Sequence, residues 1–244
     1  MHPVSIGISV PLFNENTLLT GVVADLRDAL DRCGVPWHLA LVNNGSTDDT
    51  GDTLDRIAHG DPRLIPLHLS ENAGYGGGIL HGLHALRERV NPPFIGWAWG
   101  DGQVDPGVLP ALLELCQDGA DLAKVRRRTR LDGRRRRAIT RTYGLATRAL
   151  GIRTPDVNGC PKVFRSSTLW ALNPQSQDWF LDPEVVFRLE AQGGTIAQVD
   201  ATMRPRQGGQ SKVNWRTVAE FSLALARWSQ GWRPSSQSVD AGNA

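Results

Sequence analysis

Residues 96–106 read Gly-Trp-Ala-Trp-Gly-Asp-Gly-Gln-Val-Asp-Pro, and they continue an apolar run that begins at Phe94. The run predicts a strand over Phe94–Trp99 that leads directly to Asp101. Gln103 lies two residues further on, so its side chain points the same way as that of Asp101 if the segment stays extended. Carboxylate and amide oxygens are the hard ligands that Mg²⁺ or Mn²⁺ prefers. The same residues also suit a plain Asx turn after a strand, and the stretch alone leaves both interpretations open.

The chain before this stretch alternates between strand-like and helical patterns. Strands are predicted over Val4–Val10, Trp37–Val42 and Leu64–Leu69, and helices from the turn Pro11–Asn16 through Cys33, over Asp48–His59 and over Ile79–Arg89. This alternation predicts an α/β fold, a mostly parallel sheet with helices on both faces. Ligands of such sheets bind at the carboxyl ends of the strands. Polar loops follow the first four strands there, at Asn14/Glu15, Asn43/Asn44, Asn72–Gly78 and Asp101/Gln103.

The loop Asn72–Gly78, Asn-Ala-Gly-Tyr-Gly-Gly-Gly, is rich in glycine and invites comparison with a dinucleotide-binding fingerprint. It follows the third predicted strand instead of the first, and no acidic residue ends a strand at the expected distance. We therefore favour glycines that permit a tight turn from strand to helix.

The length allows one large α/β domain or two small ones, and the charge is near neutral. The chain has 244 residues and a net charge of +2. We expect a single domain over residues 1–233, made of two halves that meet at about residues 106 and 107, and a disordered tail over 234–244. The N-terminus lacks a charged signal-peptide region, and no window approaches eighteen apolar residues. The cysteines, Cys33, Cys116 and Cys160, form no metal-ligand pattern. We expect a cytoplasmic protein with reduced thiols.

The second half contains a strongly basic segment. Lys124–Arg141 holds ten basic residues. It suits a solvated charged loop, a nucleic-acid patch or a site for a phosphate-bearing substrate. No aromatic residue is interleaved to stack on bases, which disfavours nucleic acid. Around it we predict a helix over Val108–Cys116, strands over Asp121–Val125, Val163–Phe164 and Thr195–Val199, and a helix over Pro183–Gln192.

Residues Asn214–Trp232 predict one amphipathic helix with a continuous apolar stripe, at steps of three and four residues. Such a stripe suits core packing, a dimer contact or a membrane surface. With the basic segment it motivates the hypothesis of peripheral contact with a membrane surface, because basic residues are attracted to anionic lipid.

Several motifs resemble, in order, those of family 2 glycosyltransferases of the GT-A fold, a Rossmann-like architecture, and most closely the dolichol-phosphate-mannose-synthase-like group that uses polyprenyl phosphates. The matching segments are Val10–Glu15, Val42–Asp48, Glu71–Gly74, Asp101–Gln103, Asp156–Arg165, Asp182–Glu184 and Arg206–Ser211. They span roughly residues 5–215. The resemblance implies a donor half to about residue 106 and an acceptor half from 107 to 233. The resemblance implies inverting transfer of a sugar from a nucleotide-diphosphate donor.

The resemblance also implies roles for individual residues. The donor would be held by Pro11, Phe13, Glu15, Asn43, Asn44, Gly74, Asp101 and Gln103, with Arg206 and Lys212 balancing phosphate charge. Asp101 and Gln103 would bind the Mg²⁺ or Mn²⁺ ion. Asp182 would orient or deprotonate the acceptor, and with Asp101 it completes the expected catalytic pair. The acceptor would be held by Arg126, Arg128, Arg137, Arg141 and Lys162.

Two departures from the family pattern concern the donor side. Trp99 stands where the family has its first metal-site aspartate, and Asn43 and Asn44 stand where it has paired aspartates. Three functions stay open: transfer to a polyprenyl phosphate, transfer to a soluble hydroxyl-bearing acceptor such as a natural product or glycan, and donor binding without catalysis. The sequence leaves the sugar, the base and the oligomeric state undetermined.

Overall fold

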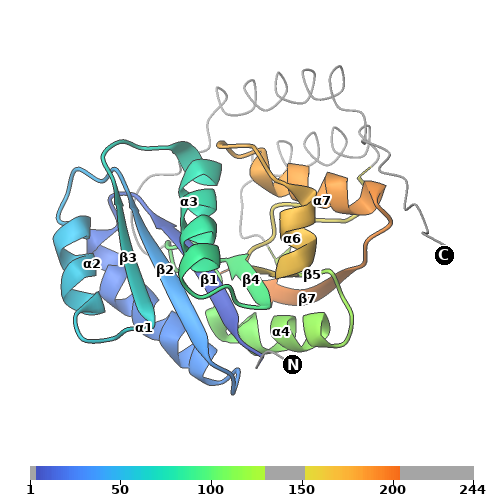
Figure 1. Ribbon diagram of the computed structural model, residues 1–244, viewed down its shortest axis with the longest axis horizontal. Helices are drawn as coiled ribbons and strands as arrows, with labels where there is room; N and C mark the ends of the chain where they lie inside the picture. Colours follow the sequence, from blue (N-terminus) through green and yellow to red (C-terminus); the bar gives the residue numbers. More distant parts are fainter. Residues whose placement is uncertain (1–3, 130–151, 204–244) are drawn as a thin grey trace, which may run out of the picture. The chain divides into compact units, whose positions relative to one another are not determined.

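A seven-stranded sheet runs through the residues that the structure, a computed structural model, describes: 4–129 and 152–203 (Figure 1). Its order is β3-β2-β1-β4-β6-β5-β7. The strands are β1 (Ile6–Leu12), β2 (Trp37–Asn44), β3 (Leu64–Leu69), β4 (Phe94–Trp97), β5 (Leu122–Thr129), β6 (Lys162–Arg165) and β7 (Ile196–Thr202). The pairs β1–β2, β1–β4, β2–β3 and β5–β7 are parallel, and β6 runs antiparallel to β4 and β5. The predicted mostly parallel α/β sheet is confirmed.

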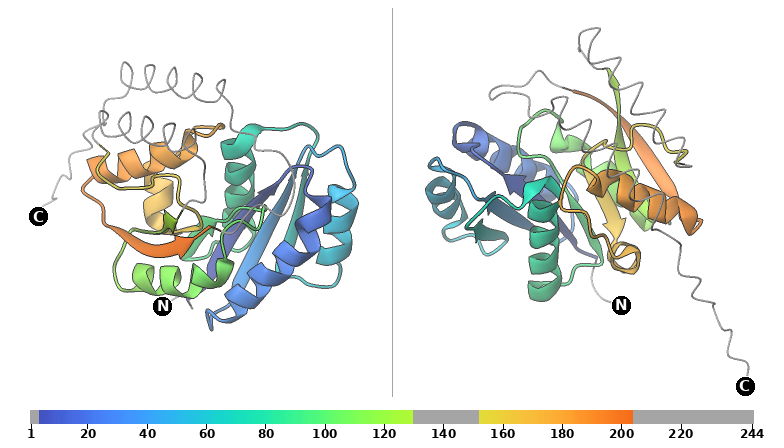
Figure 2. Two further views of the ribbon diagram at one scale, coloured as in Figure 1. Left: turned by 180° about the vertical axis from the view of Figure 1, so that it is seen from behind. Right: turned by 90° about the horizontal axis from the view of Figure 1, so that it is seen from above.

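Helices cover both faces of the sheet (Figure 2). They are α1 (Asn16–Asp31), α2 (Thr50–Ala58), α3 (Gly74–Arg89), the short 3-10 helix η1 (Pro106–Val108), α4 (Leu109–Gln117), α6 (Ser166–Leu172) and α7 (Leu181–Ala191). Buried residues of α1, α2 and α4 share one apolar cluster. Those of α3, α6 and α7 share the other. A strand buried on both faces must be apolar throughout, which explains the unbroken apolar runs of β1 and β2.

Side-chain size in β1 sets how closely α3 packs. Ile6, Ile8 and Val10 point into the cluster under α1, whereas Ser9 points the other way. Its hydroxyl donates to the carbonyl oxygen of Ile79 at 3.0 Å. A Cβ atom on Gly82 would lie 2.2 Å from the Ser9 Oγ atom. The pairing of a small serine with a glycine therefore lets helix and strand approach closely, which fixes the start of α3 beside the ends of β1 and β2.

Element boundaries differ from prediction at three functional places. Helix α3 begins at Gly74, inside the glycine-rich loop, and not at Ile79. Helix α7 begins at Leu181, so Asp182 lies in its first turn. Strand β5 continues to Thr129, which makes the solvated-loop interpretation of the basic segment wrong for its first residues.

Several predicted features lie outside the described residues. They are Arg137, Arg141, Arg206, Lys212, the helix Asn214–Trp232 and the tail 234–244. In the described ranges, no helix is both long and apolar enough to span a bilayer.

Candidate active site

The loops after β1 and β2 are tied together at the carboxyl edge of the sheet. The backbone N–H of Asn14 donates to the Ser46 hydroxyl at 3.0 Å, and the N–H of Thr47 donates to the Asn14 side-chain oxygen at 2.8 Å. The N–H of Glu15 donates to the Thr50 hydroxyl at 3.0 Å. Asn14 adopts a φ of 55°, a left-handed conformation that asparagine tolerates better than most residues. This network fixes the course of the chain through Phe13–Asn16, where the resemblance implies donor contacts.

Asn44 joins the loop after β2 to the loop after β3. Its Nδ2 atom donates to the carbonyl oxygen of Gly74 at 2.9 Å and to Oδ1 of Asn72 at 3.3 Å. Its Oδ1 atom accepts from the N–H of Ala73 at 3.0 Å. A carboxylate could make the last of these bonds but neither of the first two, because it cannot donate. These two donated hydrogen bonds explain why the position holds asparagine and not aspartate.

Asn43 has a comparable internal role. Its Oδ1 atom accepts from the N–H of Ser46 at 3.1 Å, and its Nδ2 atom lies 3.3 Å from Nδ1 of His68. Nε2 of His68 lies 3.0 Å from a carboxylate oxygen of Asp55. Asn43 is thus held from one side by the turn that follows it and from the other by β3.

The glycines that open α3 permit both a turn and a close approach. Gly74 has a φ of +80°, as expected for a tight turn. A Cβ atom on Gly76 would lie 2.3 Å from the carbonyl oxygen of Ser176, and the N–H of Gly77 donates to the carbonyl oxygen of Gln177 at 2.9 Å. The segment preceding α7 therefore packs directly on the glycine-rich loop, a contact that the sequence did not predict.

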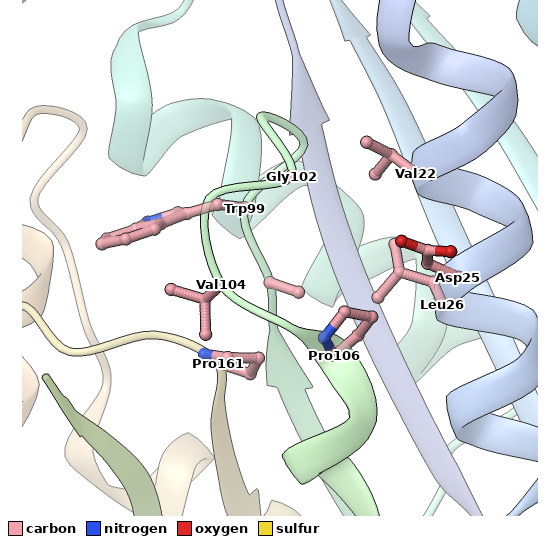
Figure 3. Close-up of a pocket in the computed structure, with 9 residues that line it drawn as sticks. Val22, Asp25, Leu26, Trp99, Gly102, Val104, Pro106 and Pro161 are labelled. Atoms are coloured by element: carbon pink, nitrogen blue, oxygen red, sulfur yellow. The ribbon is translucent and has the colours of Figure 1, made fainter. Parts of the chain in front are cut away.

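Asp101 lies in an Asx turn just beyond β4. Its Oδ1 atom accepts from the N–H of Gln103 at 3.1 Å, and Gly102 between them has a φ of +65°. Beneath this turn is a small hollow (Figure 3), lined by Val22, Asp25, Leu26, Ala98, Trp99, Gly102, Val104, Pro106 and Pro161. Figure 3 shows the Trp99 ring pointing away from α1. Both predicted metal ligands, the Asp101 carboxylate and the Gln103 amide, thus belong to this one turn.

The oxygen ligands of this turn fit a metal ion that is shared with a substrate. Within residues 4–129 and 152–203, no three His, Cys, Asp or Glu side chains gather closely enough to bind a metal by themselves. Mg²⁺ bound to nucleotide substrates is commonly held by one or two carboxylates together with phosphate oxygens and water. Asp101 alone can supply the protein part of such a site.

A chain of hydrogen bonds, half-buried at Trp99 and Tyr75 and fully buried at Asp182 and Lys162, connects the Asp101 turn to the predicted acceptor side. The indole N–H of Trp99 donates to the Tyr75 hydroxyl at 3.0 Å, and that hydroxyl donates to Oδ2 of Asp182 at 3.1 Å. Nζ of Lys162 contacts Oδ1 of Asp182 at 2.5 Å. Asp182 is 1% exposed and Lys162 is fully buried. Trp99, Tyr75, Asp182 and Lys162 together form the buried polar chain.

Further contacts fix Tyr75 and Lys162 within the buried polar chain. The Tyr75 ring stacks on Trp179 with centroids 4.2 Å apart. Burial, reinforced by the negative charge of Asp182, raises the pKa of Tyr75 well above its usual value, so the phenol remains protonated. Nζ of Lys162 also donates to the carbonyl oxygen of Gly159 at 2.8 Å.

A second buried ion pair lies beside the buried polar chain. Arg127 binds Asp156 through two guanidinium nitrogens, with contacts of 2.5–3.1 Å. Burial acts to raise the pKa of Asp156, but the hydrogen bonds and charge of Arg127 outweigh it and lower that pKa. The Arg127 guanidinium also lies 5.3 Å from the Trp99 ring centroid. Both ion pairs thus pack against the residues that precede Asp101.

Lys124 is fully buried at the end of this cluster. Its Nζ atom donates to the carbonyl oxygens of Val125 at 3.1 Å and Asp156 at 2.6 Å. Burial, together with the nearby charge of Lys162, lowers the pKa of Lys124 to about 7. Lys124 therefore belongs to the core and is not part of a solvated surface.

Arg126 and Arg128 are the described basic residues of β5 that reach the surface. Both pair with Asp200 on β7, at 2.5 Å and 2.6 Å. Lys162, predicted to contact the acceptor, is instead occupied by Asp182. The buried roles of Tyr75, Arg127 and Asp156 were missed by sequence reasoning, because partners 29 to 107 residues apart leave no local pattern.

Comparison with known proteins assigns the family. A sequence profile described as Glycosyl transferase family 2 matches residues 8–173, more than half of the chain. The chain belongs to this family. It is therefore a glycosyltransferase, and its family members are inverting enzymes that use nucleotide sugars.

Two relatives of this family member align over most of their length. An undecaprenyl-phosphate mannosyltransferase of Micrococcus luteus is 29% identical over 90% of this chain and 91% of its own. A polyprenol monophosphomannose synthase of Mycolicibacterium smegmatis is 26% identical over 91% of this chain and 85% of its own.

Solved structures agree on the fold. Glucosyl-3-phosphoglycerate synthase from Mycobacterium tuberculosis, in complex with Mn²⁺, uridine diphosphate and phosphoglyceric acid, superposes with a TM-score of 0.65. It is 20% identical, and the match covers 96% of this chain and 81% of the other. The expected GT-A architecture is confirmed by this likeness, which at this identity concerns the fold.

Proposed function

We propose that this glycosyltransferase transfers a sugar from a nucleotide-diphosphate donor to a polyprenyl phosphate, with inversion at the sugar carbon. The observation that carries the proposal is the likeness, over about nine tenths of both chains, to an undecaprenyl-phosphate mannosyltransferase. A second relative with a polyprenol phosphate in its name supports the same acceptor class.

The donor would bind at the carboxyl edge of β1, β2 and β4. Pro11, Phe13 and Glu15 stand on the segment that the Asn14–Ser46 contacts fix, and this rigidity favours a defined position for base and ribose. Asp101 and Gln103 would hold a divalent ion on the diphosphate. That ion, when bound, stabilises the negative charge that grows on the leaving diphosphate. The structural neighbour crystallised with Mn²⁺ and uridine diphosphate supports this use of the fold.

The acceptor proposal follows from the chemistry of its phosphate. A phosphate monoester has a second pKa of about 6, so it is largely dianionic at neutral pH. One of its oxygens attacks the anomeric carbon, the bond from that carbon to the donor phosphate breaks, and the nucleoside diphosphate leaves with the electron pair. No proton has to be removed from the acceptor. The exposed Arg126 and Arg128 are candidates to attract it, although both also contact Asp200.

A polyprenyl chain would lie in the membrane and present the acceptor phosphate at the membrane surface. We propose peripheral contact there through the basic part of the acceptor side. The expected contribution is about 1 kcal/mol for each Lys or Arg near anionic lipid. Arg126→Gln/Arg128→Gln should therefore sediment less with anionic liposomes at low salt than wild type. Equal sedimentation would remove these two residues from the contact.

The test of the function is a transfer assay with a panel of UDP- and GDP-linked sugars, detergent-dispersed undecaprenyl phosphate, and Mn²⁺ or a chelator. We expect one donor to give a lipid-linked product in the presence of the ion. Asp101→Asn should lower turnover by about 10²-fold or more, as loss of one electrostatic stabiliser commonly does. Donor hydrolysis or transfer to a soluble hydroxyl acceptor, with no lipid product, would contradict the proposal. Absence of any turnover would favour donor binding without catalysis.

A further inference from the structure

The buried polar chain raises the question of what Asp182 does during transfer. A general base must come within about 2.6–3.2 Å of the proton that it removes. Asp182 is 1% exposed, and each of its carboxylate oxygens already accepts a hydrogen bond, one from Lys162 and one from Tyr75. Because the carboxylate is buried, an acceptor could reach it only if the groups packed on it, Lys162 and Tyr75 among them, moved aside.

Opening the pair would be costly. Lys162 is fully buried, and its Nζ atom also donates to the carbonyl oxygen of Gly159 and lies 5.5 Å from the centroid of the Trp97 ring. Separating the two groups would leave an uncompensated charge in a low-dielectric interior, where a broken pair is strongly unfavourable. The geometry therefore favours a charge partner over a proton acceptor.

The buried polar chain also extends to the donor side of the site. Trp99 is two residues before Asp101, and its indole N–H is fixed by Tyr75. Tyr75 is itself fixed by Asp182 and by stacking on Trp179. At this position the family has a metal-site aspartate, whose carboxylate would face a metal ion. Here an indole faces a phenol instead, so the position supports the turn from within the protein.

We propose that Asp182 is the buried counter-ion of Lys162 and the anchor of Tyr75 and Trp99, which position the Asp101 turn, and that Asp182 does not remove a proton from the acceptor. Tyr75, Trp99 and Lys162 are accordingly positioning residues. The inference deepens the proposed function and rests on it, because an enzyme without a base needs an acceptor that arrives ionised. It also explains how the family chemistry can proceed with one carboxylate in the metal-site motif.

The decisive test removes both charges of the pair together. Lys162→Met and Asp182→Asn each leave one buried charge alone and should lose activity and stability. The double variant Lys162→Met/Asp182→Asn removes both charges, while the asparagine oxygen can still accept from Tyr75. Turnover of GDP-mannose and UDP-glucose with undecaprenyl phosphate should return to within about tenfold of wild type, because a buried pair can be replaced by neutral residues at little cost. The pH profile of kcat/KM should match that of wild type.

A base role predicts a different pattern. Without its base, the double variant would stay about 10²–10⁴-fold slower than wild type although it folds, and the acidic limb of its pH profile would disappear. Either result would overturn the inference. Urea unfolding of the four proteins gives an independent readout. The inference requires the double variant to lose less free energy of unfolding than the two single variants lose together.

The positioning role has its own measurement. Trp99→Phe and Tyr75→Phe should raise the KM for the donor severalfold and leave the KM for undecaprenyl phosphate unchanged, and the combined variant should be no worse than Tyr75→Phe alone. A change confined to the acceptor KM would overturn this part. Should wild type prove inactive toward undecaprenyl phosphate, the proposed function fails, whereas the stability coupling of Lys162 and Asp182 still decides whether they act as one buried pair.

Discussion

The side-chain amide of Asn44 donates to the carbonyl oxygen of Gly74 at 2.9 Å, and its oxygen accepts from the N–H of the preceding residue, Ala73. One side chain thus bridges the loops after two neighbouring strands. The bridge holds the turn from which α3 starts, and α3 carries Tyr75 into the buried polar chain.

Replacing this amide should reveal the bridge. Asn44→Asp keeps the shape of the side chain but loses both donated hydrogen bonds, and Asn44 is only 4% exposed. We expect a loss of about 1–3 kcal/mol in the free energy of unfolding, typical of a buried hydrogen-bonding group left unsatisfied. Urea unfolding measures it, with Glu88→Gln on the exposed side of α3 as control. Unchanged stability would mean that the bridge contributes nothing.

The close approach at the start of α3 predicts opposite effects of alanine at two glycines. Gly76→Ala should be destabilising, because its Cβ atom would lie 2.3 Å from the Ser176 carbonyl oxygen. Gly21 lies within α1 with nothing within 4 Å of its would-be Cβ atom. Gly21→Ala should therefore stabilise by about 0.5–1 kcal/mol. Thermal unfolding of both variants tests the pair, and a destabilisation of similar size at each site would argue against the contact.

The two ion pairs of β5 should differ in their contribution to stability. Arg127→Met leaves Asp156 unpaired where both side chains are largely buried, and should cost about 3–5 kcal/mol. Arg126→Met is the matched control, since its pair with Asp200 is solvent-exposed and should contribute no more than about 1 kcal/mol. Urea unfolding at neutral pH compares them.

The same pair predicts an acid dependence. The pKa of Asp156 is lowered in the folded state, so its stabilising contribution is fully present above the unfolded value of 3.8 and is lost as the pH falls below it. The difference in stability between wild type and Arg127→Met should shrink below pH 3.8. A difference that stays constant through this range would contradict the lowered pKa.

Lys124 predicts a dependence on alkaline pH. Its pKa is lowered from 10.5 to about 7, so between these values the unfolded state binds more protons than the folded state. Stability should therefore rise with pH across this window, by at most about 1.4 kcal/mol per pH unit. Cys33 and Cys116 act in the opposite sense above pH 9, because burial raises the pKa of each to about 11. The difference between wild type and Lys124→Met isolates the lysine, and a flat difference would show that Lys124 stays protonated.

The sequence predicted the sheet well because its strands are buried on both faces. Apolar runs such as Trp37–Val42 leave a clear pattern, and β2 covers this range. Strand β5 was cut short at Val125, since the arginines that follow do not resemble a core strand. Arg127 is nevertheless buried there, because Asp156 neutralises it from a segment 29 residues away.

The polar loops were also predictable, but their internal contacts were not. Alternation placed Asn43/Asn44 and Asp101/Gln103 at the ends of strands β2 and β4, as the structure has them. That Asn44 serves the neighbouring loop, or that Trp99 reaches Asp182 through Tyr75, depends on tertiary packing. A residue can match a family motif by position and still form its hydrogen bonds with other residues of the protein.

The most direct measurement of the central claim compares two acceptors that differ only in their phosphate. Undecaprenyl phosphate and undecaprenol, dispersed in the same detergent, are offered with the donor that the sugar panel identifies. The account predicts a lipid-linked sugar from the phosphate, with an inverted anomeric configuration, and none from the alcohol. Equal or faster transfer to the alcohol would contradict it, because a hydroxyl acceptor needs the base that Asp182 is proposed not to be.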